Sequence, residues 1–268
     1  MDKYITRKKK VKKPAEIGLV SGSQHDHEGE KDEKNQPISK RLRIDSKTES
    51  SEIDLRILQH IPQKKKIFRE NLDCDYLHLY SKKEADILFQ RCEESLDYFT
   101  GDLARIKVYG KWHDIPRKQV AHGDTGVTYK YSGVTVPAKP WIPLLIEIRD
   151  RIQEVTGFKF NFVLINRYAD GNNYMGEHRD DEKDLVATSP IASLSLGQNR
   201  DFIFRHCEAR GSQAKRQIPP VKVELEHGSL LMMNYPTNVY WYHSLPVRKK
   251  ALNTRVNMTF RDIVTVKK

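Results

Sequence analysis

The sequence has few cysteines and no long apolar run, and both absences exclude whole classes of protein. Its 268 residues include only Cys74, Cys92 and Cys207, which are too widely spaced for a CxxC metal or redox pair and too few for a disulfide scaffold. No stretch approaches the roughly 20 consecutive apolar residues of a membrane-spanning helix. Charged residues also stand where a signal peptide would place its apolar core. We therefore expect a protein of a reducing compartment that has no membrane segment.

Apolar residues are scarce overall, whereas basic residues are in excess. Hydrophobic side chains make up 38% of the chain, and 47 Lys and Arg stand against 36 Asp and Glu, a formal net charge of +11. The mean hydropathy is -0.70. This composition is poor for one globule of this length but suits a domain of roughly 200 residues that carries a polar tail. The positive charge indicates a polyanionic partner.

The polar residues are concentrated in the first 70 residues, which contain 18 Lys and Arg and 12 Asp and Glu. Such a segment cannot bury enough apolar surface to offset its chain entropy. The basic runs Lys8 to Lys13 and Lys40 to Arg43 are typical of nuclear import signals or nucleic-acid contacts, with solvated tail charge as the alternative. We predict a disordered basic tail over residues 1–70 and a folded domain over residues 71–268.

Apolar periodicity predicts helices first and strands afterwards. Ser81 and Glu84 form an S-x-x-E capping box ahead of apolar residues at helical spacing, and a second helix is expected from Pro143 to Gly157. Beyond Phe158 the apolar period changes to two. Strands are expected at 160–168, 191–196, 202–206, 221–226, 230–234 and 255–265. This order predicts an α+β protein whose sheets close into a barrel or jelly roll.

Three residues in the strand-rich half are candidate metal ligands. In an extended segment, residues two apart project to the same side, so His178 and Asp180 can converge on one ion. His243 lies among aromatic residues that would keep its imidazole neutral and able to ligate. Neither feature is specific alone. Most H-x-D sequences are solvated residues on the protein surface, and a lone histidine is more often an ordinary, partly buried side chain than a metal ligand.

The strand predicted at 255–261 carries a stronger signal. Two guanidiniums on an inward face are costly to bury unless an anion compensates them, and each can hold a carboxylate through two hydrogen bonds. On the neighbouring strand, Asn166 and Tyr168 also point inward. This arrangement favours a dicarboxylate ligand. The polar face of the strand consists of Arg255, Asn257, Thr259 and Arg261.

Two histidines, one aspartate and an arginine-bearing strand fit the two-His-one-carboxylate triad of non-haem Fe(II) oxygenases, which leaves positions open for co-substrate and oxygen. A zinc or manganese hydrolase built on the same triad is a second hypothesis, although it would not need the paired arginines. A DNA-binding protein with an inactive iron site is a third, which the three occupied ligand positions disfavour.

Four segments together resemble the AlkB family of Fe(II)/2-oxoglutarate-dependent dioxygenases, and within it the nuclear branch that acts on duplex DNA. They are residues 161–168, 178–182, 241–246 and 255–261, and the resemblance extends from about Leu72 to Lys268. It implies a double-stranded β-helix, or jelly-roll, core with supporting helices. It further implies that Fe(II) is held by His178, Asp180 and His243, and 2-oxoglutarate by Asn166, Tyr168, Arg255, Thr259 and Arg261.

The family's reaction splits 2-oxoglutarate to succinate and carbon dioxide, with O2 as co-substrate, while it hydroxylates a methyl group on a damaged base. The hydroxymethyl product then loses formaldehyde. The resemblance therefore implies a DNA repair enzyme that demethylates N1-methyladenine and N3-methylcytosine in double-stranded DNA by base flipping. A family member that prefers single-stranded DNA or RNA is the alternative.

The same resemblance implies substrate contacts in two hairpins and in an acidic turn. Tyr109, Gly110 and Lys111 correspond to an intercalating hairpin, and Tyr129, Lys130 and Tyr131 to a substrate lid, with Tyr for the usual Phe at positions 109 and 131. The ring face needed for stacking is retained. Asp181 and Glu182 would accept hydrogen bonds from an exocyclic amine and favour a cationic methylated base. The alternatives are that Tyr109 packs on Trp112 and that the acidic turn is merely solvated.

The remaining predictions concern partners. Candidate contacts to DNA phosphates, which fix register without reading sequence, are Arg210, Lys215, Arg248, Lys249 and Lys250. At the N-terminus, Lys3, Tyr4, Ile5, Thr6 and Arg7 resemble the motif by which this branch docks on the replication sliding clamp, although Thr6 stands where an aliphatic residue is expected. The resemblance implies a nuclear monomer.

Overall fold

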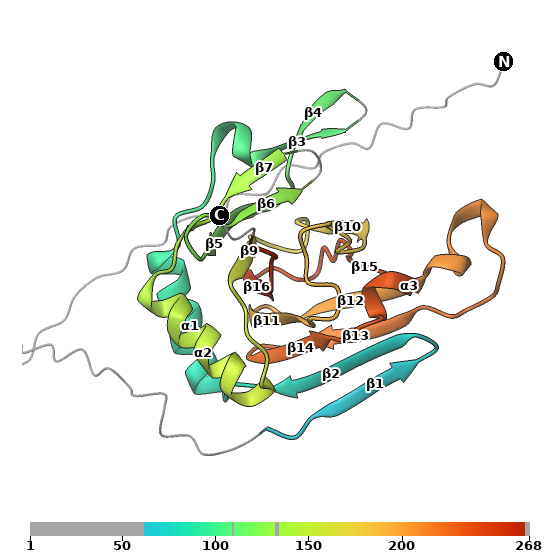
Figure 1. Ribbon diagram of the computed structural model, residues 1–268, viewed down its shortest axis with the longest axis horizontal. Helices are drawn as coiled ribbons and strands as arrows, with labels where there is room; N and C mark the ends of the chain where they lie inside the picture. Colours follow the sequence, from blue (N-terminus) through green and yellow to red (C-terminus); the bar gives the residue numbers. More distant parts are fainter. Residues whose placement is uncertain (1–61, 109, 132–133, 266–268) are drawn as a thin grey trace, which may run out of the picture. The chain divides into compact units, whose positions relative to one another are not determined.

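The computed structural model describes residues 62–108, 110–131 and 134–265, which form two β-sheets, two hairpins and two principal helices (Figure 1). The larger sheet has eight strands in the order β1-β2-β14-β11-β16-β9-β5-β8, and the smaller has four in the order β10-β15-β12-β13. Strands far apart in sequence are therefore neighbours, as in a double-stranded β-helix. This confirms the predicted α+β jelly-roll class.

The strands of the larger sheet are β1 (Lys65–Arg69), β2 (Leu72–His78), β5 (Lys118–Gly123), β8 (Lys139–Pro140), β9 (Phe162–Tyr168), β11 (Ile191–Gly197), β14 (Ser229–Met233) and β16 (Arg255–Arg261). Those of the smaller sheet are β10 (Met175–His178), β12 (Arg200–His206), β13 (Val221–Leu225) and β15 (Trp241–Leu245). The hairpins, which flank β5 in sequence, pair β3 (Arg105–Val108) with β4 (Lys111–Asp114) and β6 (Thr128–Tyr131) with β7 (Val134–Pro137).

Both long helices begin where the sequence predicts, and the second also ends there. In α1 (Lys82–Ser95), the Ser81 side chain accepts a hydrogen bond from the Glu84 backbone, and the Glu84 carboxylate accepts one from Ser81. The second, α2 (Pro143–Thr156), stops at Gly157, whose φ of 78° favours glycine. No helix in the described ranges is long and apolar enough to cross a membrane. The shorter helices are η2 (Gly101–Ala104), η3 (Cys207–Ala209), η4 (Gly211–Gln213) and α3 (Thr237–Tyr240).

The two faces of the larger sheet have different partners. One face packs with α1 and α2 in a hydrophobic cluster that includes Leu88, Leu145 and Met258. The other face shares a second cluster with the smaller sheet, in which Leu231 and Tyr168 join Phe204 and Trp241. Residues that alternate along β9 and β16 therefore point by turns to the helices and to the space between the sheets. The polar residues of these strands lie on this second side.

The boundary predicted for the disordered tail is wrong at its C-terminal end. Residues 65–69 lie inside the predicted tail of residues 1–70, yet they form β1 and pair with β2 through a turn at Asn71, whose φ is 56°. The strand was missed because lysine and arginine dominate it, as is common at a sheet edge. The remainder of the predicted tail, residues 1–61, lies outside the described residues.

Candidate active site

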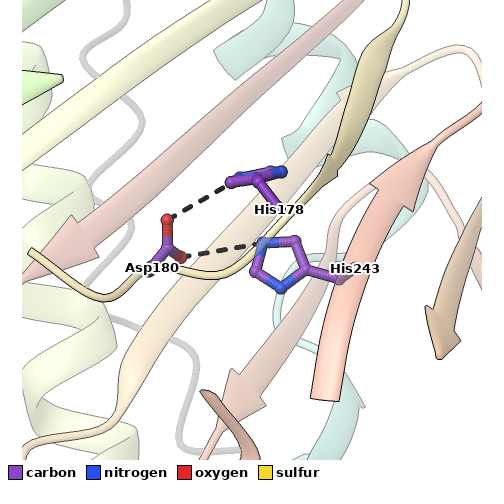
Figure 2. A group of neighbouring side chains, drawn as sticks. All are labelled: His178, Asp180 and His243. Carbon is purple, nitrogen blue, oxygen red and sulfur yellow. Dashed lines mark ion pairs between the residues drawn. The ribbon is translucent and has the colours of Figure 1, made fainter. Parts of the chain in front are cut away.

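Three ligand side chains come together between the two sheets. His178 ends β10, Asp180 follows two residues later, and His243 lies on β15, directly opposite His178 in the antiparallel pairing. One ligand atom from each residue lies within 4.8 Å of the others (Figure 2). The pairing of β10 with β15 thus joins an H-x-D sequence to a histidine 65 positions further along.

Hydrogen bonding leaves the inward nitrogen of His178 available for a metal. Its Nδ1 lies 2.9 Å from the carbonyl oxygen of Gly176, which can only accept a hydrogen bond, so Nδ1 carries the proton. The other nitrogen, Nε2, lies 3.8 Å from Oδ1 of Asp180, and in the neutral imidazole it is the nitrogen that carries the lone pair. A backbone carbonyl often holds a metal-ligating histidine in this tautomer.

His243 is neutral because it is buried. Burial, together with the neighbouring His178, lowers the pKa of His243 to about 3. Its ring stacks on Phe202 with centroids 5.1 Å apart, and its Nε2 lies 3.8 Å from Oδ2 of Asp180. A neutral imidazole in a fixed orientation can ligate a metal without first losing a proton.

Asp180 is ionised although it is buried. Burial alone would raise its pKa, but the positive charge of Arg261 and the nearby His243 and His178 outweigh that effect and hold the pKa below its ordinary value. Nη2 of Arg261 donates to Oδ1 of Asp180 at 3.0 Å. One carboxylate and two imidazoles match the donor set of an Fe(II) site with open positions, so these residues fit the metal.

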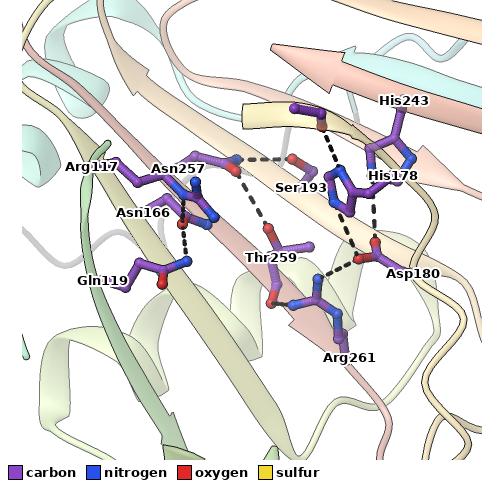
Figure 3. A network of polar contacts seen from close by, with 11 residues as sticks. Arg117, Gln119, Asn166, His178, Asp180, Ser193, His243, Asn257, Thr259 and Arg261 are labelled. Carbon is purple, nitrogen blue, oxygen red and sulfur yellow. Dashed lines mark hydrogen bonds and ion pairs between the residues drawn. The ribbon is translucent and has the colours of Figure 1, made fainter. Parts of the chain in front are cut away.

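A row of polar side chains crosses the larger sheet beside this cluster. Asn257 on β16 lies opposite Asn166 on β9, and Arg255 lies opposite Tyr168. These residues line one cavity with the three ligand residues. The alternation of β9 and β16 therefore places the predicted co-substrate residues on one inner face, next to the candidate metal site. Figure 3 shows three of them, Asn166, Thr259 and Arg261, beside the ligand cluster.

Arg255 fits an anion, because two of its buried donors have no partner among the described residues. Its side chain is only 1% exposed, and Nη2 donates to the Ser195 hydroxyl at 3.0 Å, but Nε and Nη1 have no acceptor. Burial lowers its pKa to about 10, which leaves it charged at neutral pH. Buried unsatisfied donors are costly, so a carboxylate from a ligand would complete this site.

The second arginine of the strand has a different neighbour. Arg261 donates to Asp180, as described above, and through Nη1 to the carbonyl of Thr259 at 3.3 Å. The Thr259 hydroxyl lies 3.4 Å from Oδ1 of Asn257, and the Asn257 amide donates to Ser193 at 2.9 Å. Arg261 and Thr259 thus link the ligand cluster to the polar row.

Sequence reasoning missed two residues that contact this row. Arg117 and Gln119 both donate to Oδ1 of Asn166, at 2.7 and 2.8 Å. They lie almost 50 positions before Asn166, Arg117 just before and Gln119 within a strand, β5, that was not predicted. No motif marks them, and only the pairing of β5 with β9 brings them to Asn166.

The predicted base-contacting residues are in three places. Asp181 and Glu182 directly follow the ligand cluster and line a cavity of about 420 Å³, together with Arg261. Gly110 lies at the turn between β3 and β4, Lys111 begins β4, and residues 129–131 form most of β6. Tyr109 lies outside the described residues.

The predicted phosphate contacts differ in how far their charges are already paired. Arg210 forms an ion pair with Glu177 and stacks on the Tyr242 ring, and Arg248 donates to Asp201 at 2.7 Å. The exposed ones are Lys215, Lys249 and Lys250. The clamp-docking residues Lys3 to Arg7 and both basic runs lie outside the described residues.

Comparisons with known proteins agree with this geometry. Residues 74–261 match the model of the 2OG-Fe(II) oxygenase superfamily. The chain is 58% identical over 203 residues to the protein named DNA oxidative demethylase ALKBH2 of Bos taurus, covering 76% of this chain and 73% of that one. The Homo sapiens protein of the same name is 58% identical over 207 residues, covering 77% and 79%. The alpha-ketoglutarate-dependent dioxygenase alkB homolog 3 of Rattus norvegicus is 35% identical over 199 residues, covering 71% and 63%.

Proposed function

Because the chain belongs to the AlkB family of the 2OG-Fe(II) oxygenase superfamily, we propose that it is a DNA repair dioxygenase. Its proposed substrates are N1-methyladenine and N3-methylcytosine in double-stranded DNA, which it demethylates with release of formaldehyde. The observation that carries this proposal is the position of the His178, Asp180 and His243 cluster beside a buried arginine, Arg255, with unsatisfied donors. The relatives named as DNA oxidative demethylases support the choice of substrate.

In this proposal the two halves of the site hold different groups. His178, Asp180 and His243 hold Fe(II), while Arg255, with Asn166, Tyr168, Thr259 and Arg261, binds and orients 2-oxoglutarate. When bound, Fe(II) with 2-oxoglutarate and O2 supplies an oxidant able to hydroxylate an unactivated methyl group. The neutral state of His243 and the ionised state of Asp180 mean that these two ligands can bind the metal at neutral pH without first losing a proton.

The base and the duplex contact residues outside this core. A flipped base carrying a positive charge is favoured by the carboxylates of Asp181 and Glu182, which line the cavity next to Asp180. We assign base stacking to Tyr131 of the lid formed by residues 129–131, and filling of the vacated stack to Tyr109 of the hairpin with Gly110 and Lys111. Phosphate contacts are assigned to Arg210, Lys215, Arg248, Lys249 and Lys250, with the largest contribution from the exposed lysines.

We further propose a cell compartment for the enzyme and separate roles for its tail and its folded domain. A DNA repair activity requires a compartment that contains DNA, and the basic runs at Lys8 to Lys13 and Lys40 to Arg43 favour the nucleus. We assign these runs and the clamp-docking motif at Lys3 to Arg7 to a basic tail, and catalysis to the domain that begins with β1. We propose that the enzyme acts as a monomer.

Turnover on matched oligonucleotides tests the proposal. The protein is loaded with Fe(II) without oxygen and then given 2-oxoglutarate, air and N1-methyladenine in duplex or single-stranded DNA or RNA. We expect succinate, formaldehyde and unmodified adenine in equal amounts, with the fastest repair on duplex DNA. His178→Ala should lower the rate about 1,000-fold or more, because a metal ligand is lost. His78→Ala, which changes an exposed histidine on β2, serves as the matched control.

Two outcomes would overturn parts of this proposal separately. Equal succinate formation by the wild type and His178→Ala would refute the assigned metal site. Faster repair of single-stranded DNA or of RNA would refute the preference for duplex DNA. Hydrolysis of a substrate without consumption of 2-oxoglutarate would favour a metal-dependent hydrolase instead.

A further inference from the structure

The Asn166 amide has one saturated end and one unsatisfied end. Its Oδ1 accepts hydrogen bonds from Nε of Arg117 and from Nε2 of Gln119, whereas its Nδ2 is buried and has no partner among the described residues. We propose that Arg117 and Gln119 are positioning residues, which fix this amide so that its NH2 group faces the 2-oxoglutarate pocket as a donor. The inference rests on the proposed function, because it concerns the same co-substrate site.

Hydrogen-bond chemistry determines the orientation of both amides. An arginine side chain has donors and no acceptor, so the Asn166 atom 2.7 Å from Nε of Arg117 is the oxygen. The Gln119 atom 2.8 Å from that same oxygen must then be the amide nitrogen. Arg117 thus determines the orientation of Asn166, and Asn166 determines that of Gln119.

The fold holds the two donors in place from two directions. Gln119 on β5 lies directly opposite Asn166 on β9, so both side chains project from the same side of the sheet. Arg117 precedes β5 and is held from the other side by the carbonyl of Tyr174, 3.3 Å from its Nη1. Figure 3 shows Arg117 and Gln119 both directed at Asn166. Gln119 is 8% exposed and Asn166 is 1% exposed, so water does not replace these contacts easily.

The orientation matters because the pocket is built for an anion. Arg255 presents two unsatisfied donors to the same cavity that Asn166 lines. A fixed NH2 group adds a third donor at no cost in reorganisation when the dicarboxylate binds. If the amide rotated by half a turn, its oxygen would face the carboxylate and repel it. Two donors behind Asn166 prevent this rotation.

Replacing Gln119 by an acceptor distinguishes orientation from packing. Gln119→Glu keeps the size of the side chain but places an acceptor against Oδ1 of Asn166, so the amide is expected to rotate. Gln119→Met removes one donor without adding an acceptor, and Arg117 still holds the amide. We therefore compare the dissociation constant of 2-oxoglutarate, by calorimetry on Mn(II)-loaded protein, in the wild type and both variants.

We expect 2-oxoglutarate to bind Gln119→Glu roughly 10- to 100-fold more weakly than the wild type, the cost of losing a hydrogen bond to a charged group. Gln119→Met should lose less than about 5-fold. The KM for 2-oxoglutarate should rise in the same order, while kcat at saturating co-substrate changes little. Arg117→Lys, which loses the guanidinium fork, should fall between the two.

An Asn166→Ala background separates amide rotation from the charge of the new glutamate. Without the amide, the two Gln119 variants should bind 2-oxoglutarate within about 3-fold of each other, whereas a simple charge effect would persist. Equal affinities of Gln119→Glu and Gln119→Met for 2-oxoglutarate in the protein that retains Asn166 would overturn the inference. A difference between them that persists in the Asn166→Ala protein would overturn it as well. Failure of the wild type to bind 2-oxoglutarate would instead overturn the proposed function. If Gln119→Glu does not fold, the affinities of Arg117→Lys and Arg117→Met for 2-oxoglutarate are compared instead. Lysine can still donate to Oδ1 of Asn166 and methionine cannot, so equal affinities would overturn the inference.

Discussion

Two arginines on one strand, β16, illustrate how position within the sheet sets the role of a side chain. Arg255 faces a serine hydroxyl and has two donors without a partner among the described residues, whereas Arg261, six residues further along the strand, forms an ion pair with Asp180. The first is prepared for an external anion. The second compensates the carboxylate of a candidate metal ligand, which would otherwise be a buried charge without a cation.

Replacing Arg261 tests this second role. Arg261→Met should lower the free energy of unfolding of the metal-free protein by about 3 kcal/mol, because it leaves the Asp180 carboxylate uncompensated in a buried site. With saturating Mn(II) the loss should be smaller, since the cation then takes over this compensation. Urea unfolding with EDTA and with Mn(II) measures both values. Lys82→Met, which breaks an exposed ion pair with Asp86, should cost less than about 1 kcal/mol. Equal losses for Arg261→Met in both conditions would contradict the assignment.

At this scale the sequence predicts residues within a motif better than residues that support it. His178 and Asp180 are two apart in an extended segment, and Arg255 and Arg261 share one alternating strand. The period of two of an extended chain is therefore enough to predict that each pair lies on one face. Arg117 and Gln119 have no such local signal. Their contact with Asn166 depends on the register of β5 against β9, which a single sequence does not specify.

Among the elements, the helices were predictable because their signals are local. The capping box at Ser81 and the glycine at position 157 define the ends of α1 and α2 without reference to the rest of the chain. The strands β10 and β15 carry the candidate metal ligands, but they were not predicted as strands. They are only 4 and 5 residues long, and β10 contains a single apolar residue, Met175, so neither strand has a clear apolar alternation.

The loops that flank these two strands are fastened to each other. Gly171, before β10, donates to the carbonyl of Ala251 at 2.6 Å, and its own carbonyl accepts from the Arg248 backbone at 2.7 Å. Arg200 also joins the two loops, since Nη2 donates to the carbonyls of Asn173 and Pro246, both at 2.9 Å. The loop that leads to His178 therefore cannot move independently of the loop that carries the predicted phosphate contacts.

Gly171→Ala tests how closely the two loops fit. A Cβ atom at this position would lie 1.7 Å from the Arg248 carbonyl oxygen, a backbone atom, so one loop must shift. We expect a loss of about 3 kcal/mol in the free energy of unfolding, measured with urea. The control is Gly176→Ala, where no atom of the described residues, apart from its chain neighbours, lies within 4 Å of the added carbon and the change should stay within about 1 kcal/mol. Similar stabilities of the two variants would show that the loops are not held as described.

For the whole molecule, the net charge of +11 indicated a polyanionic partner. In the structure, however, several of the basic side chains near the site are already used within the fold. Arg255 faces the proposed co-substrate pocket and Arg261 forms an ion pair with Asp180, while Arg210 and Arg248 form ion pairs with Glu177 and Asp201. Composition alone cannot separate these roles, because ion pairs within the fold form between residues far apart in sequence. Binding of DNA should therefore depend mostly on the exposed lysines.

The salt dependence of DNA binding tests this distribution of charge. Each phosphate contact contributes about 0.9 to the slope of log K against log salt for duplex DNA. Changing both Lys249 and Lys250 to Gln should therefore reduce the slope by about 1.8, measured by fluorescence anisotropy between roughly 50 and 200 mM salt. Arg248→Gln should reduce the slope less than a change of either lysine, because the Arg248 side chain already donates to Asp201 at 2.7 Å.

Lys159→Gln, an exposed change just beyond α2, is the matched control and should leave the slope as in the wild type. An unchanged slope in the double lysine variant would show that this loop does not contact the phosphates, and a larger effect of Arg248→Gln would show that DNA displaces Asp201 from its arginine.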